Sequence, residues 1–89
     1  MDQKIDWDLE YISGVLSDIE VIDLPWTDLE KVSIGIDWDT VLGRFLRLDL
    51  QAFDEKQIIE LEKIKQRLSI QKSKVQELGF EYPEIGEKL

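Results

Sequence analysis

The sequence predicts an α+β fold in which a small antiparallel sheet packs against a long C-terminal helix. Apolar and polar residues alternate over 31–38 and again over 44–52, which is the period of a half-buried strand. Helix-capping residues bracket the range 54–79, and strong helix formers fill it. An all-α bundle is the alternative architecture.

The chain has 89 residues and is expected to form a single domain over 1–89. We divide it into an acidic α/β half at 1–53, the long helix at 54–79 and a tail at 80–89. A chain of this length has room for one modest hydrophobic core.

Residues 6–17 fit two kinds of secondary structure. Apolar residues alternate with acidic ones from Ile5 to Tyr11, as they do in a strand. A longer set also falls on one face of a helix: Ile5, Leu9, Ile12, Leu16 and Ile19. The longer match favours a helix over 6–17, and both assignments stay open here.

The segment before the hairpin contains short signals of strand and turn. Residues 19–24 are rich in β-branched side chains and end at Pro25, so they are a candidate strand. Thr27 and Glu30 have the spacing of a capping box, which predicts a single helical turn.

The hairpin is predicted over 31–38 and 44–52, with Gly43 in the turn between the strands. A helix over 38–53 is the competing interpretation, because several apolar residues of that range also share a helical face. It would leave Asp49 unpaired in the middle of the apolar face, which is costly. We therefore prefer the strands.

The C-terminal helix has clear signals at both ends. Asp54 and Gln57 form a capping box, and Gly79 can adopt the left-handed conformation that ends a helix. Its apolar seam follows heptad steps with one polar member: Leu61, Ile64, Leu68, Gln71, Val75 and Leu78. Such a helix would be roughly 36 Å long, whereas the radius of gyration of the domain would be roughly 12 Å. It would overhang its own core, which predicts an oligomer or a bound partner.

Composition argues against an enzyme. The chain contains no His and no Cys, and its five glycines are isolated, so common catalytic triads and phosphate-binding loops are absent. The pairs Asp6/Asp8 and Asp37/Asp39 are the candidate ligands for a divalent cation, but the EF-hand pattern fails after Asp39. We predict no catalytic residues, no metal site and no cofactor.

The charge is unevenly distributed along the chain. The net charge is −9, and residues 1–53 carry 12 acidic and 4 basic side chains, a balance of −8. Such a surface repels a phosphate backbone and attracts a basic protein. We expect no direct binding of nucleic acid. The predicted partner-binding acidic face consists of Asp6, Asp8, Glu10, Asp37, Asp39 and Trp26. Trp7 and Trp38 are predicted to lie in the core.

Two functions follow from these features. The first is a small, acidic, non-enzymatic protein that binds and inhibits or regulates a basic partner, as antitoxins, immunity proteins and nucleic-acid mimics of phage or host-defence systems do. The alternative is an assembly or scaffold subunit that forms a homodimer, or binds a partner, through the seam of helix 54–79. The lack of cysteine, of a signal peptide and of a long apolar run predicts a cytoplasmic protein without a membrane segment.

Overall fold

The computed structural model describes residues 3–22 and 26–83, and every regular element in these ranges is helical. The elements are α1 (Gln3–Val21), α2 (Asp28–Leu46), the short 3-10 helix η1 (Leu50–Ala52), α3 (Glu55–Ile70) and α4 (Lys72–Glu77). The predicted α+β fold is therefore wrong, and the all-α alternative describes the architecture. The molecule is elongated, with extents of 40 × 20 × 19 Å.

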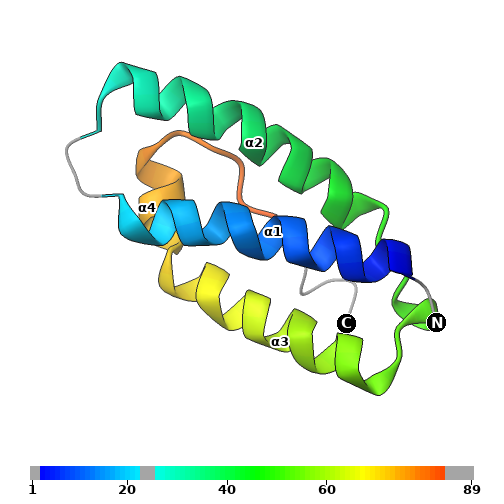
Figure 1. Cartoon of the computed structure of the whole chain (residues 1–89). Helices are drawn as coiled ribbons and strands as arrows, with labels where there is room; N and C mark the ends of the chain where they lie inside the picture. Colours follow the sequence, from blue (N-terminus) through cyan, green and yellow to red (C-terminus); the bar gives the residue numbers. More distant parts are fainter. Residues whose placement is uncertain (1–2, 23–25, 84–89) are drawn as a thin grey trace.

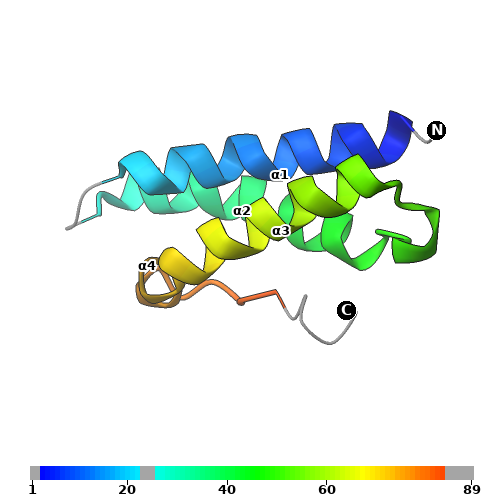
Figure 2. The same cartoon turned by 90° about the horizontal axis from the view of Figure 1, so that it is seen from below.

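Helix α1 lies between α2 and α3 in the view of Figure 1 and along one side of the bundle in Figure 2. It packs against α2 on one side and against α3 on the other. Helix α2 runs antiparallel to α1, and α3 returns in the direction of α1 (Figures 1 and 2). The core-facing side chains of α1 are almost completely buried: Ile5, Leu9, Ile12, Leu16 and Ile19. The helical interpretation of 6–17 is correct, and the helix extends beyond that range in both directions.

The predicted strand at 31–38 is part of α2. Ile34 and Trp38 of this helix are buried, together with Val41 and Phe45 one and two turns further on. Val32 and Ile36 lie on the opposite face and are exposed. Two apolar faces on one helix therefore produced the alternation that resembles a strand.

Local capping explains where α2 begins and ends. The Thr27 hydroxyl accepts a hydrogen bond from the Glu30 amide, and the Glu30 side chain accepts one from the Thr27 amide. This capping box starts a helix of 19 residues, not the single turn predicted. The predicted strand 44–52 is also wrong, because residues 44–46 are the end of α2 and residues 50–52 form η1. Asp49 has a partner, because its side chain accepts a hydrogen bond from the Gln51 amide and caps η1.

The candidate strand at 19–24 is wrong over the residues that the structure describes. Residues 19–21 form the last turn of α1, and Ile22 follows it. Residues 23 and 24 lie outside the described ranges, as do residues 84–89 of the predicted tail.

The predicted helix 54–79 is divided at Gln71. Asp54 and Gln57 form the expected capping box, and α3 ends at Ile70. Helix α4 then turns away from the axis of α3 (Figure 2). The Lys74 ammonium group donates to the carbonyls of Ile19 and Glu20 at the end of α1. If the helix continued straight beyond α3, its last turns would pass the end of α1 and would overhang the core, as the sequence predicts.

The bend brings the end of the helical segment back onto the core. Val75 and Leu78 are fully buried as a result. Burying such side chains contributes roughly 1.5–3 kcal/mol each. Backbone hydrogen bonds continue at the bend, where the Gln71 amide donates to the Arg67 carbonyl and the Val75 amide to the Gln71 carbonyl. The expected overhang is therefore absent.

The tail returns along α2 after a glycine-dependent turn. Gly79 has φ +77°, and the amides of Gly79 and Phe80 donate to the carbonyls of Gln76 and Val75. This pattern is a Schellman motif, as expected for Gly79. The Phe80 ring then stacks on Trp38, whose indole N–H donates to the Glu81 carbonyl at 2.7 Å. These contacts cover the side of the core opposite α1.

The capping box of α2 provides a test of the fold. Thr27→Ala removes the acceptor of the Glu30 amide and should lower the free energy of unfolding by about 1 kcal/mol. Thr40→Ala is the matched control, because Thr40 is exposed in the interior of the same helix and should change stability by less than about 0.5 kcal/mol. Urea denaturation followed by circular dichroism measures both. Equal effects would show that the cap at Thr27 does not stabilise α2.

Candidate interaction surface

Asp8 is the most buried of the residues assigned to the acidic face, with an exposed fraction of 3%. Arg44 donates to its Oδ1 at 2.6 Å, and Arg47 donates to both carboxylate oxygens at 2.7 and 3.2 Å. The Arg44 guanidinium also lies over the Tyr11 ring, 4.3 Å from its centroid. Asp8 therefore joins α1 to the end of α2 and is not available to a partner.

The surroundings of Asp8 favour its charged form. Burial alone would raise the pKa of the Asp8 carboxyl, but the hydrogen bonds and charges of Arg47 and Arg44 together outweigh it and lower that pKa. At the other end of α1, the hydrogen bond from Arg67 outweighs partial burial and lowers the pKa of Glu20. Both carboxylates stabilise the bundle as anions.

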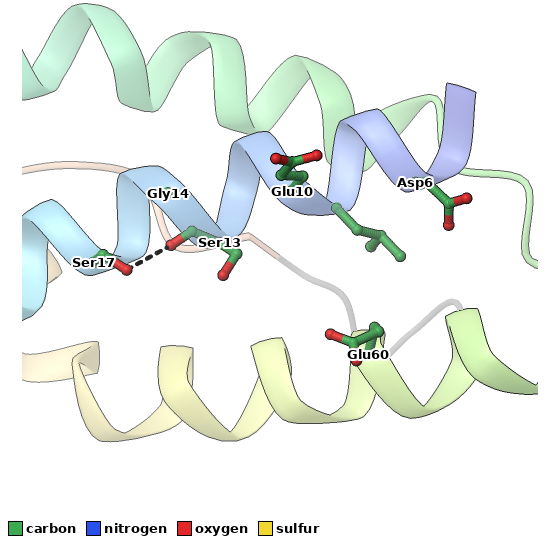
Figure 3. A pocket seen from close by; sticks show the side chains of 7 residues that line it. Asp6, Glu10, Ser13, Gly14, Ser17 and Glu60 are labelled. Carbon is green, nitrogen blue, oxygen red and sulfur yellow. Dashed lines mark hydrogen bonds between the residues drawn. The ribbon is translucent and has the colours of Figure 1, made fainter. Parts of the chain in front are cut away.

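Asp6 and Glu10 lie in a different place, a groove of about 410 Å³ between α1 and α3. Figure 3 shows Asp6, Glu10, Ser13 and Ser17 along α1, with Glu60 facing them from α3. The Asp6 carboxylate accepts a hydrogen bond from the Gln57 amide group at 3.0 Å, and Arg67 donates to Ser13 Oγ at 2.6 Å. The groove is thus crossed by contacts that hold α1 to α3.

The remaining residues of the predicted acidic face are on or before α2. Asp39 is exposed, Asp37 is half-buried, and Trp26 is half-buried against the core. The six residues therefore do not form one surface. Among the described residues, no group of three acidic side chains has an arrangement that would hold a metal ion.

The predicted helix seam lies inside the bundle. Five of its members have exposed fractions of at most 2%, namely Leu61, Ile64, Leu68, Val75 and Leu78. Gln71 is half-buried at the bend between α3 and α4. These apolar side chains are therefore buried in the core of the chain itself, where the sequence predicts a contact with a second copy or a partner.

Three exposed apolar side chains form a row on α2. Leu29, Val32 and Ile36 have exposed fractions of 80%, 62% and 67%. Their spacing of three and four residues puts them on one face, and their Cα atoms extend about 10 Å along the axis. We call these three residues the α2 stripe. The strand interpretation missed it, although the same spacing was present in the sequence.

Exposed apolar residues elsewhere do not form a comparable row. Trp7 is 62% exposed, so its predicted place in the core is wrong, whereas the prediction for Trp38 is confirmed. Val21 and Ile70 are each 77% exposed at the ends of α1 and α3, and Ile58 and Ile59 are about half exposed near the start of α3. Single exposed apolar side chains are ordinary, but a continuous row on one face is typical of a contact surface.

Polar residues surround the α2 stripe without a basic side chain among them. On a helix, the neighbours of a residue lie three and four positions away. Asp28 is such a neighbour of Val32, and Asp39 is one of Ile36, and both carboxylates are exposed. Ser33 and Thr40 occupy the other edge. The stripe is therefore apolar with one acidic edge.

Comparisons of the chain with protein-family models, with curated proteins and with solved structures find no match. In the part of the chain that the structure describes, no helix combines the length and the apolar character that crossing a membrane requires. The function must therefore be inferred from the surface of the fold itself.

The Asp8 ion pairs predict a dependence of stability on pH. Asp8→Asn should lower the free energy of unfolding by about 1–3 kcal/mol at pH 7, because two charge-assisted hydrogen-bonding partners are lost and Arg47 remains partly solvated. The folded pKa is lowered, so this contribution is complete above the ordinary pKa of Asp and is lost as the pH falls through the folded pKa.

Urea denaturation of both proteins between pH 2 and 7 measures this dependence. The difference between them should be constant above about pH 5 and should narrow below about pH 4. A difference that stays constant down to about pH 2 would contradict the ion-paired state of Asp8.

The location of the seam predicts which side chains stabilise the monomer. Leu68→Ala should cost about 2–5 kcal/mol, because Leu68 is fully buried in the core. Ile70→Ala, two residues later in the same helix, should cost less than about 0.5 kcal/mol. Denaturation at several protein concentrations separates core from interface. A loss for Leu68→Ala that appears only at high concentration would assign the seam to an oligomer.

Proposed function

We propose that this protein is a non-enzymatic protein-binding module that takes part in assembly, and that it contacts its partner through the α2 stripe. The observation that carries the proposal is that α2 has two apolar faces and the fold buries one of them. Ile34, Trp38, Val41 and Phe45 occupy the buried face, while the stripe stays exposed. A partner that covered the stripe would account for the second face.

The energetics support a contact of this kind. Complete burial of a Leu, Val or Ile side chain contributes roughly 1.5–3 kcal/mol. Three such side chains provide the apolar centre of a small interface, although ordering of the two proteins offsets part of the gain. Leu46 lies further along α2 and is 76% exposed, so a longer partner could reach it as well.

The assembly role is favoured over an inhibitor that uses the acidic face as first defined. Of the acidic residues assigned to that face, Asp8 is held by two arginines and Asp6 by Gln57. A contact role needs no catalytic group, and we take the protein to be non-enzymatic. We also place it in the cytoplasm, because a chain without cysteine suits a reducing compartment.

The proposal is tested by removing the stripe while keeping the fold. Val32→Ser combined with Ile36→Ser should leave the thermal midpoint almost unchanged, since both side chains are exposed. In quantitative affinity isolation from cells that express the chain natively, the double variant should lose the proteins retained by the unmodified chain. Ile70→Ser is the matched control, because it removes an equally exposed isoleucine from α3. Retention of the same proteins by the double variant would refute the proposal.

A further inference from the structure

We propose that the partner segment seated on the α2 stripe is an amphipathic helix whose apolar ridge is flanked by Lys or Arg. This inference rests on the proposed function and adds the chemistry of the partner.

The shape of the stripe fits a helical partner segment and not an extended one. The backbone amides and carbonyls of α2 are used within the helix, so an extended peptide cannot add to it as a strand. A row of apolar side chains at steps of three and then four residues is the seam along which one helix packs against another. Small or short side chains at Ser33, Thr40 and Gly43 leave room for that helix along the row.

The charges beside the stripe select a basic partner. Asp28 and Asp39 are exposed on one edge, and the helical neighbours of the stripe on the described part of α2 include no Lys or Arg. The tail brings Glu81, an exposed residue, next to α2, because Phe80 lies against Gly35 and the Glu81 backbone carbonyl accepts a hydrogen bond from Trp38. Lysines or arginines on a partner helix would face these carboxylates across a solvated rim.

The same charges disfavour a second copy of this chain as the occupant. Two α2 stripes packed together would bring carboxylates toward carboxylates, and each chain already has a net charge of −9. Like charges placed opposite each other at an interface are unfavourable, whereas opposite charges accelerate association and select the partner. Two or three rim pairs, each changing the affinity by up to about fivefold, would together change it by about tenfold.

The test uses three synthetic helical peptides and the intact chain. The first has a leucine ridge at steps of three and four residues with lysine on both flanks. The second replaces these lysines with glutamate, and the third keeps the composition of the first but scrambles the leucine spacing. Fluorescence anisotropy gives Kd at low and at physiological salt. The lysine peptide should bind at least about tenfold more tightly than either of the others, and salt should weaken its binding.

Variants of the protein identify the surface that binds. Ile36→Ser should weaken binding of the lysine peptide by about tenfold. The double variant Asp28→Asn with Asp39→Asn should reduce its affinity and its salt dependence. Glu62→Gln is the control, because Glu62 is an exposed acid on α3 and should not matter. The thermal midpoint of each variant verifies that it is folded.

The other outcomes each contradict the inference in a distinguishable way. If the glutamate peptide binds as well as the lysine peptide and Ile36→Ser weakens both, the stripe is a binding surface but its partner is not selected by charge. If Ile36→Ser has no effect, binding is unspecific attraction to an acidic protein, and the proposed function loses its support too. If sedimentation shows a dimer that Ile36→Ser dissociates, the occupant is a second copy. Failure of all three peptides to bind a monomeric protein also overturns the inference.

Discussion

The packing of α1 between α2 and α3 is the constraint on which the rest of the structure depends. Ile12, Leu16 and Ile19 are completely buried along its length, and polar clamps hold both ends. At one end Asp8 binds Arg44 and Arg47, and at the other Arg67 and Lys74 bind the last turns of α1. Since α1 ends at Val21, the C-terminal helical segment has to bend to keep its last apolar side chains buried.

This arrangement decides which apolar surface is left for a partner. The heptad seam of α3 and α4 covers α1 and has no exposed apolar area to offer. Helix α2 needs only one face for the core, and its other face carries Leu29, Val32 and Ile36 into solvent. The acidic residues are likewise divided between the core scaffold and the exposed surface. Asp8 is part of the scaffold, whereas Asp39 lies beside the exposed row and is free to meet a basic side chain.

The parts of the fold that depend on local chemistry were predictable from the sequence. The Asp54 and Gln57 capping box and the left-handed Gly79 are formed as expected, because each involves residues within one turn. The strand assignment failed at Val32 and Ile36, since apolar residues on opposite faces of a helix mimic the alternation of a strand. The sequence predicts a surface position for Asp8, because the arginines that bind it are 36 and 39 positions away and no local pattern links them to it. The bend at Gln71 likewise depends on where α1 ends, which no local pattern reveals.

The central claim is that the exposed face of α2, not the C-terminal seam, contacts a partner. Site-specific photo-cross-linking in cells that express the chain natively tests it directly, with the photoreactive side chain at Val32 or at Gln66, which is exposed on α3. The account predicts a cross-linked adduct of defined mass from position 32 and none from position 66. An adduct from position 66 alone, or equal adducts from both positions, would contradict it.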